Sequence, residues 1–296
     1  MGLHIKKDGI KKMDDKTMDM KSTKALAVQI RKNILRAIAS AGKGHIGGSL
    51  SIADTLAVLY NGVMNIDPNN PSKKDRDILV MSKGHCGPAF YGALAAKGYF
   101  ADSWLDTLNK NNTRLPSHTD RLKTPGVDMT TGSLGQGAST AAGSAFADAL
   151  DHKDNYTYLI LGDGELDEGQ VWESFLFVSH RKLTNLITIV DANGKQLDGT
   201  TESVCNLGSI EDKFRSFGYH VISVKNGNDC EQIYEALKEA KQTKDRPSTI
   251  ILHTIKGAGI QYYATMDNCH STEVKKEMLD SFYKELDDSL NEVNNV

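Results

Sequence analysis

Cysteine is scarce in this chain. The four cysteines, Cys86, Cys205, Cys230 and Cys269, lie far apart and form no CxxC pair. Zinc sites and small disulfide frameworks both need closer or more regular spacing. The sequence therefore predicts free thiols in a reducing compartment, and we expect a cytoplasmic protein.

Long apolar runs and a large excess of one charge are also missing. No stretch approaches the roughly 18 uninterrupted apolar residues of a membrane helix, and the first residues lack the apolar core of a secretory signal. A formal net charge of -3 is too small for a protein that holds nucleic acid through clustered Lys and Arg. We expect neither a membrane span nor a nucleic-acid partner.

Proline is sparse as well, because the six prolines are dispersed and mark no hinge between domains. One domain over residues 22–285 is the simplest division. It would follow a flexible leader over residues 1–21, rich in Lys, Asp and Met, and precede an acidic tail over residues 286–296.

Helical periodicity is clearest in the first third of the domain. Apolar residues recur at helical spacing from Ser22, a candidate N-cap, until Gly42 stops the run. A second helix is expected from Ser51 through Leu59.

Short β-rich runs alternate with helical stretches along the rest of the chain. The runs cover residues 78–81, 156–161, 186–190, 220–224 and 249–254, and helical stretches lie near 169–181, 210–217 and 229–243. Apolar strands separated by helices are typical of a sheet buried on both faces. The pattern predicts an α/β fold: a mainly parallel sheet with helices on both faces.

The run that ends at residue 161 leads directly into Gly162-Asp163-Gly164. Ligands of open α/β sheets bind at the carboxyl ends of strands, and a carboxylate there suits Mg²⁺, Ca²⁺ or Mn²⁺. Asn193 follows the next run, so an amide oxygen would reach the same edge. With a backbone carbonyl just beyond it, at Lys195, three metal ligands are predicted. An isolated GDG is more often a simple βα turn with capping residues.

Five blocks together resemble transketolases over roughly residues 23 to 275. They are GDGELDEGQVWESF (162–175), LITIVDANGKQLDG (186–199), GKGHIGGSLSIADTLAVLY (42–60), DRDILVMSKGHCGPAFYGAL (75–94) and TPGVDMTTGSLGQGASTAAG (124–143). The resemblance implies the thiamine diphosphate-binding fold, in its diphosphate-binding domain, with thiamine diphosphate and a divalent metal as cofactors.

The resemblance also implies roles for four histidines. His85 would contact the diphosphate, His45 and His118 would face substrate hydroxyls, and His270 would lie at the mouth shared by diphosphate and substrate. Ser271 stands where the family commonly has Gly. Outside such motifs, a loop histidine is usually solvated or a helix cap.

The glycine-rich segment is expected to meet the cofactor's aminopyrimidine ring through Gly132, Ser133 and Leu134, although transketolases often carry Pro at the position of Ser133. Gly164 would let the backbone approach the diphosphate, and Glu165 would meet the cofactor or substrate hydroxyls.

Three further charged residues receive roles from the same resemblance. Glu168 and Glu173 would face the subunit boundary and link two active sites, although acidic residues at a helix start often only complement its dipole. Lys256 would place a cation near the diphosphate, with a solvated lysine as the alternative.

The glutamate that activates the aminopyrimidine belongs, in the family, to a pyrimidine-binding domain that this sequence lacks. The resemblance therefore implies a partner, the C-terminal transketolase subunit, in a heterotetramer with two copies of each chain; a fragment of a longer enzyme would look the same. Deoxyxylulose phosphate synthase, the decarboxylating component of 2-oxo acid dehydrogenases, a transketolase for a modified or sulfonated sugar and a non-catalytic binding module remain as alternatives.

Overall fold

The computed structural model describes residues 18–294. Most of the predicted leader, residues 1–17, lies outside the described residues. The first helix, α1 (Met20–Ala41), begins inside the predicted leader, because the carboxylate of Asp19 accepts hydrogen bonds from the backbone N–H groups of Lys21 and Ser22. The predicted cap at Ser22 is therefore wrong. Gly42 ends the helix with φ 85°, as a glycine readily can.

The second predicted helix is divided differently. It consists of α2 (Ile46–Ser51), α3 (Ala53–Val58) and a π-helical turn (Leu59–Val63), with Ile52 outside helical geometry between the first two. The expectation of a single helix starting at Ser51 was therefore wrong at its start.

Five parallel strands form the central sheet in the order β2-β3-β4-β6-β5. They are β2 (Ile78–Met81), β3 (Thr157–Gly162), β4 (Leu186–Ala192), β5 (His220–Val224) and β6 (Ser248–His253). The predicted parallel sheet is confirmed, with strand ends shifted by two residues at most. A two-residue antiparallel pair, β1 (Lys43–Gly44) with β7 (Thr272–Glu273), lies apart from it.

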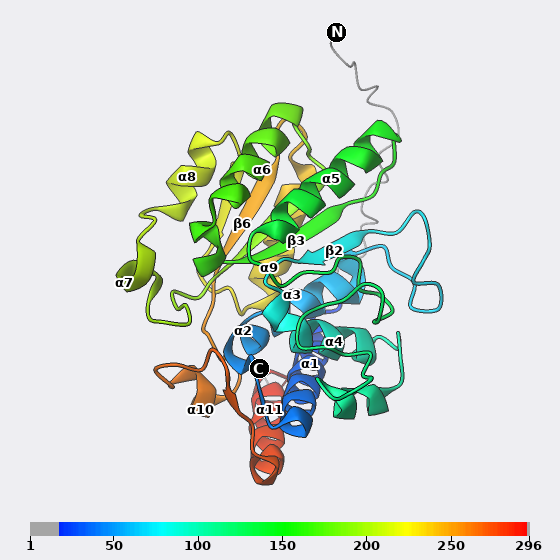
Figure 1. Cartoon of the computed structure of the whole chain (residues 1–296), viewed down its shortest axis with the longest axis vertical. Helices are drawn as coiled ribbons and strands as arrows, with labels where there is room; N and C mark the ends of the chain where they lie inside the picture. Colours follow the sequence, from blue (N-terminus) through cyan, green and yellow to red (C-terminus); the bar gives the residue numbers. More distant parts are fainter. Residues whose placement is uncertain (1–17, 295–296) are drawn as a thin grey trace.

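Helices cover both faces of the sheet, as predicted (Figure 1). The remaining ones are α4 (Gly87–Ala96), α5 (Gln136–Leu150), α6 (Gly169–Arg181), α7 (Thr201–Cys205), α8 (Ile210–Ser216), α9 (Cys230–Gln242), α10 (Gln261–Ala264) and α11 (Leu279–Asn294). Successive side chains of a strand point to opposite faces. Tyr158 and Ile160 of β3 accordingly join the core under α1, α3, α4 and α9, while Leu159 and Leu161 join the core under α5, α6 and α8.

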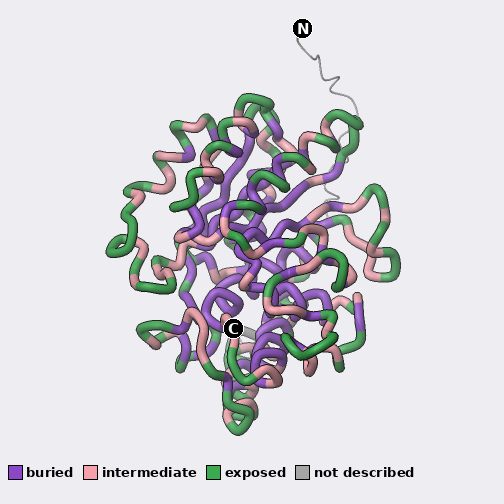
Figure 2. The backbone as a smooth tube through the Cα atoms, viewed as in Figure 1, coloured by how far each residue is buried: buried purple, intermediate pink, exposed green. Residues whose placement is uncertain are grey.

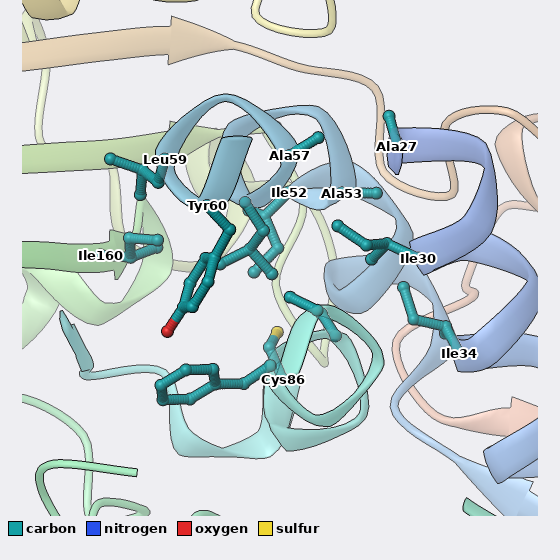
Figure 3. Packing of buried hydrophobic residues seen from close by; sticks show 14 of the residues in the cluster. Ala27, Ile30, Ile34, Ile52, Ala53, Ala57, Leu59, Tyr60, Cys86 and Ile160 are labelled. Carbon is teal, nitrogen blue, oxygen red and sulfur yellow. The ribbon is translucent and has the colours of Figure 1, made fainter. Parts of the chain in front are cut away.

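The larger core packs α1 against α3 and the sheet. Figure 3 shows Ile30 of α1 facing Ala53 of α3. Leu59, in the π-helical turn, and Ile160, in β3, lie further along the same cluster. In Figure 2 the central strands are largely buried, and most of the exposed backbone belongs to the outer helices and loops. The polar side chains at the strand ends are therefore held on a rigid frame.

The last helix crosses the predicted end of the domain. α11 continues past residues 285 and 286 to Asn294, and Leu286 is only 1% exposed. Among the helices described for residues 18–294, none is long and apolar enough to span a membrane.

Candidate active site

The strand ends bring the predicted metal ligands together. Asp163 follows β3 and is 5% exposed; its carboxylate accepts hydrogen bonds from Gly164 N–H (2.9 Å) and Gly194 N–H (2.6 Å). Burial, reinforced by the charge of Asp191, raises the pKa of Asp163 to about 6. A positive charge beside Asp163 would therefore be stabilising.

Asn193 and Lys195 present two further oxygens beside Asp163. The Asn193 carboxamide donates through Nδ2 to Asp191 Oδ2 (3.0 Å), and its Oδ1 accepts from Lys195 N–H (3.1 Å). The Lys195 carbonyl accepts from Lys256 Nζ (2.7 Å). One carboxylate, one amide oxygen and one carbonyl form a hard donor set that fits Mg²⁺, Ca²⁺ or Mn²⁺. No alternative cluster of three or more His, Cys, Asp or Glu side chains suits a metal within residues 18–294.

The four predicted histidines form one cluster, although they come from distant segments. The ring centroid of His45 lies 5.2 Å from that of His85, 5.7 Å from that of His118 and 5.4 Å from that of His270. The rings of His85 and His270 are 5.0 Å apart. His118 is exposed and the other three are half-buried, so the cluster faces an opening.

Burial lowers the pKa of all four imidazoles. It does so for His45 and His118, and for His85 it acts with nearby Lys83 to bring the pKa well below the ordinary value. The pKa of His270 falls to about 4, through burial and the neighbouring charge of Lys256. At neutral pH the cluster is uncharged, and each ring can both donate and accept a hydrogen bond.

The glycine-rich segment lies against this cluster. A Cβ on Gly132 would lie 3.2 Å from His118 Cδ2, and a Cβ on Gly84, next to His85, would lie 2.7 Å from the Thr131 carbonyl carbon. Ser133 is exposed and Leu134 half-buried. The two loops therefore touch through backbone that only glycine allows, and Ser133 and Leu134 stand at the rim.

Glu165 is buried and hydrogen-bonded to three protein groups. It is 2% exposed, and its carboxylate accepts from Ser82 Oγ (2.5 Å), Gly135 N–H (2.8 Å) and Gly162 N–H (3.3 Å). These three hydrogen bonds join the loops after β2 and β3 to the start of α5. The expected contact of Glu165 with the cofactor or with substrate hydroxyls stays a prediction.

No hydrogen bond or ion pair links Gly164, Glu168 or Glu173 to the histidine cluster among the described residues. A Cβ on Gly164 would lie 2.7 Å from Gln196 Cγ, so a protein side chain already packs against this glycine. Glu168 is the N-cap residue of α6, without a capping hydrogen bond from its side chain, and Glu173 lies within the helix; both are exposed and lie outside the histidine cluster. Lys256, by contrast, is buried and also lies 3.2 Å from His270 Nδ1.

Sequence reasoning missed a buried ion pair beneath the site. Lys83 Nζ lies 2.5 Å from Asp191 Oδ2, and the two residues are 2% and 0% exposed. Ser51 Oγ (2.7 Å) and Thr254 Oγ1 also donate to this carboxylate. Both charged residues stand inside blocks that carry the family resemblance, but residue type alone does not show that they pair.

Known proteins resemble this chain over nearly its whole length. Residues 22–288 match the family described as "Transketolase, thiamine diphosphate binding domain". The 6-deoxy-6-sulfo-D-fructose transketolase subunit SqwG of Clostridium sp. (strain MSTE9) is 49% identical over 87% of this chain and 94% of its own length. An apulose-4-phosphate transketolase subunit of Phocaeicola vulgatus is 35% identical over 94% of this chain and 96% of its own length.

Solved transketolase structures share the fold. The enzyme from Leishmania mexicana superposes with a TM-score of 0.82 at 31% sequence identity, and the match covers 93% of this chain but 45% of that chain. The chain therefore spans less than half the length of that transketolase.

Proposed function

The chain belongs to the transketolase family through its thiamine diphosphate-binding domain, and we propose that it is one subunit of a two-subunit transketolase. The proposed reaction transfers a two-carbon ketol unit from a ketose or ketose phosphate to an aldose or aldose phosphate. The observation that carries this proposal is the meeting of four neutral histidines with an oxygen donor set at one edge of the sheet.

We assign the divalent metal to Asp163, the amide oxygen of Asn193 and the carbonyl of Lys195. His85 and Lys256, which both lie next to His270, would bind the diphosphate by hydrogen bonding and charge. When bound, thiamine diphosphate supplies the carbon nucleophile for the ketose carbonyl, and the metal fixes its diphosphate.

The histidines at the opening act on the sugar. A neutral imidazole has one nitrogen that can accept a proton from a hydroxyl and one N–H that can donate to another oxygen. We assign this role to His45 and His118, with His270 at the mouth between sugar and diphosphate. Gly132, Ser133 and Leu134 would line the side that receives the aminopyrimidine ring. A cluster so arranged favours catalysis over a non-catalytic binding module.

Support for a separate partner comes from the relatives. Two proteins of nearly the same length are named as transketolase subunits, while the Leishmania mexicana transketolase is more than twice as long as the part that matches. We infer that a C-terminal subunit supplies the pyrimidine-binding domain and its glutamate.

A second copy of this chain would pack on α6. Glu168, Glu173 and Leu176 are exposed on or beside this helix, Leu176 at 59%, and neither carboxylate has an ion-pair partner among the described residues. The transketolase resemblance implies that the glutamates at these two positions face the boundary with a second copy, and this exposed face is open to one. Two copies of each chain would then make a heterotetramer.

The test is a two-carbon transfer assay with the chain alone, with a co-purifying partner alone, and with both mixed. Activity is expected only from the mixture, because the activating glutamate and half of the cofactor's binding surface lie on the partner. A mixture containing Asp163→Ala chain is the matched control and should be inactive. Full activity from this chain by itself would contradict the two-subunit proposal.

A sulfonated ketose is a second candidate for the donor. Over the aligned residues, the 6-deoxy-6-sulfo-D-fructose transketolase subunit is 49% identical to this chain, whereas the apulose-4-phosphate transketolase subunit is 35% identical. Comparing kcat/KM for 6-deoxy-6-sulfo-D-fructose with kcat/KM for a ketose phosphate would decide. A clear preference for the phosphate would remove the sulfosugar as donor.

A further inference from the structure

Lys83 is a charged side chain sealed inside the strand ends. Only 2% of it is exposed, and its ammonium group lies 2.5 Å from Asp191 Oδ2 and 3.2 Å from the Gly48 carbonyl oxygen. Burying two charges carries a desolvation cost that mutual attraction offsets only when the geometry is good and the remaining hydrogen bonds are made. A hydrophobic pair of similar volume could fill the same space without this cost, so stability alone does not explain why Lys83 and Asp191 are charged.

The lysine side chain links three neighbouring strands. It starts just after β2, and its Cδ lies 3.7 Å from the position that a Cβ on Gly162 would take at the end of β3. It then reaches Asp191 on β4. Because the strand order is β2-β3-β4, the side chain crosses the end of the middle strand, directly below the loop that begins with Asp163.

Asp191 passes this restraint to Asn193. Its Oδ2 accepts from Lys83 Nζ, Ser51 Oγ and Asn193 Nδ2. A carboxylate paired with lysine has no proton to donate, so only the NH₂ side of the Asn193 carboxamide can face it. The amide oxygen must then point the other way, beside the loop backbone whose Gly194 N–H binds Asp163.

We propose that Lys83 is a positioning residue for the metal site: by fixing Asp191 it turns the amide oxygen of Asn193 toward the cation. The inference rests on the proposed function, which supplies the metal. Asp191 is also held by Thr254 from the loop after β6, but only Lys83 brings the opposite charge to this carboxylate among the described residues. Partners that orient metal ligands from behind commonly change metal affinity by about 10- to 100-fold when they are removed.

Charge and position predict opposite results for Lys83→Met. If the lysine acted only as a nearby positive charge, its removal would leave Asp163 and Asp191 with less positive charge around them and strengthen cation binding. If it positions Asn193, its removal releases the Asp191 carboxylate from its place, the Asn193 carboxamide that is bonded to it shifts as well, and cation binding weakens.

The measurement is Mn²⁺ binding, followed by electron paramagnetic resonance, to the chain assembled with its partner and saturated with thiamine diphosphate. We expect Mn²⁺ affinity to fall about 10- to 100-fold in Lys83→Met. Lys153→Met is the matched control, since Lys153 pairs with Asp148 and Asp151 at the C-terminal end of α5. The Mn²⁺ affinity of this variant should stay within about two-fold of that of the unaltered protein.

A second variant covers the case in which Lys83→Met does not fold. Lys83→Met with Asp191→Asn removes both buried charges, keeps the net charge, and should show the same loss, because an Asn at 191 accepts either orientation of the Asn193 amide. Equal or tighter Mn²⁺ binding in the folded variants would overturn the inference. Failure of the unaltered assembly to bind Mn²⁺ and thiamine diphosphate would instead refute the proposed function, and this inference with it.

Discussion

Replacing Gly137 with alanine tests how tightly the start of α5 packs against the loop after β2. Gly137 is the second residue of α5, and a Cβ there would lie 2.7 Å from the backbone Cα of Ser82. Real Cβ atoms do not approach a Cα so closely. Either α5 or the segment that carries Ser82, Lys83 and His85 must therefore move.

The same helix contains its own control. A Cβ on Gly143 would have nothing within 4 Å, and this residue is exposed. Both substitutions exchange Gly for Ala in α5. In a helix interior that exchange stabilises by about 0.5–1 kcal/mol, which applies in full to Gly143 and at most in part to Gly137 in the first turn. Only Gly137→Ala adds the overpacking, which costs about 1–3 kcal/mol in a well-packed site. We expect Gly143→Ala to raise the free energy of unfolding and Gly137→Ala to lie about 1–3 kcal/mol below it.

Urea unfolding of the chain without cofactor measures this difference through the transition midpoints. Calorimetry with thiamine diphosphate, on the chain assembled with its partner, should also show weaker binding for Gly137→Ala, because His85 follows Ser82 closely in the same loop. If Gly137→Ala matched Gly143→Ala in both stability and cofactor affinity, the close packing at Ser82 would not constrain the site.

Three other substitutions test individual roles. Asp163→Ala should abolish metal-dependent binding of thiamine diphosphate while leaving the circular dichroism spectrum unchanged; unchanged affinity would remove Asp163 from the metal site. His118→Ala should lose about 1–3 kcal/mol of transition-state stabilisation, roughly 5- to 150-fold in kcat/KM, at unaltered cofactor affinity, and the reverse pattern would contradict its substrate role. The pKa of His270 is about 4 in the folded chain, below the ordinary value near 6.5, so protonation favours the unfolded chain. Urea midpoints should therefore fall as the pH drops from about 6.5 toward 4, and they should fall less steeply in His270→Gln. An identical fall in both proteins would show that His270 is not the cause of the loss of stability.

The sheet and its carboxyl edge could be predicted because their signals are local. A parallel strand buried on both faces is a short apolar run, and the runs at residues 78–81 and 220–224 match β2 and β5 without a shift. The carboxyl ends of parallel strands share one edge, so residue type at those ends was enough to bring Asp163 and Asn193 to one place.

The direction in which a side chain points, and the residue with which it pairs, could not be predicted, because both depend on partners that are distant in the sequence. Glu165 binds Ser82, 83 residues earlier, and Lys83 binds Asp191, 108 residues later. A sequence shows that a carboxylate follows a strand, but not whether it faces the opening or a neighbouring loop. Even the local cap of α1 was misplaced, since Asp19 and Ser22 are both acceptable N-cap residues and only the backbone decides between them.

The two consecutive residues after β2 explain why the separate blocks act together. Ser82 holds Glu165, which in turn holds the first turn of α5 through Gly135, while Lys83 holds Asp191 and through it Asn193. The loop that presents His85 is thus fixed to the loop after β3 and to the end of β4 by buried carboxylates on both. Breaking one such contact leaves a buried polar group unpaired, which costs more than the contact itself contributes. A substitution in one block should therefore displace the loops of the other blocks. It should change the positions of the metal ligands and of the histidines together.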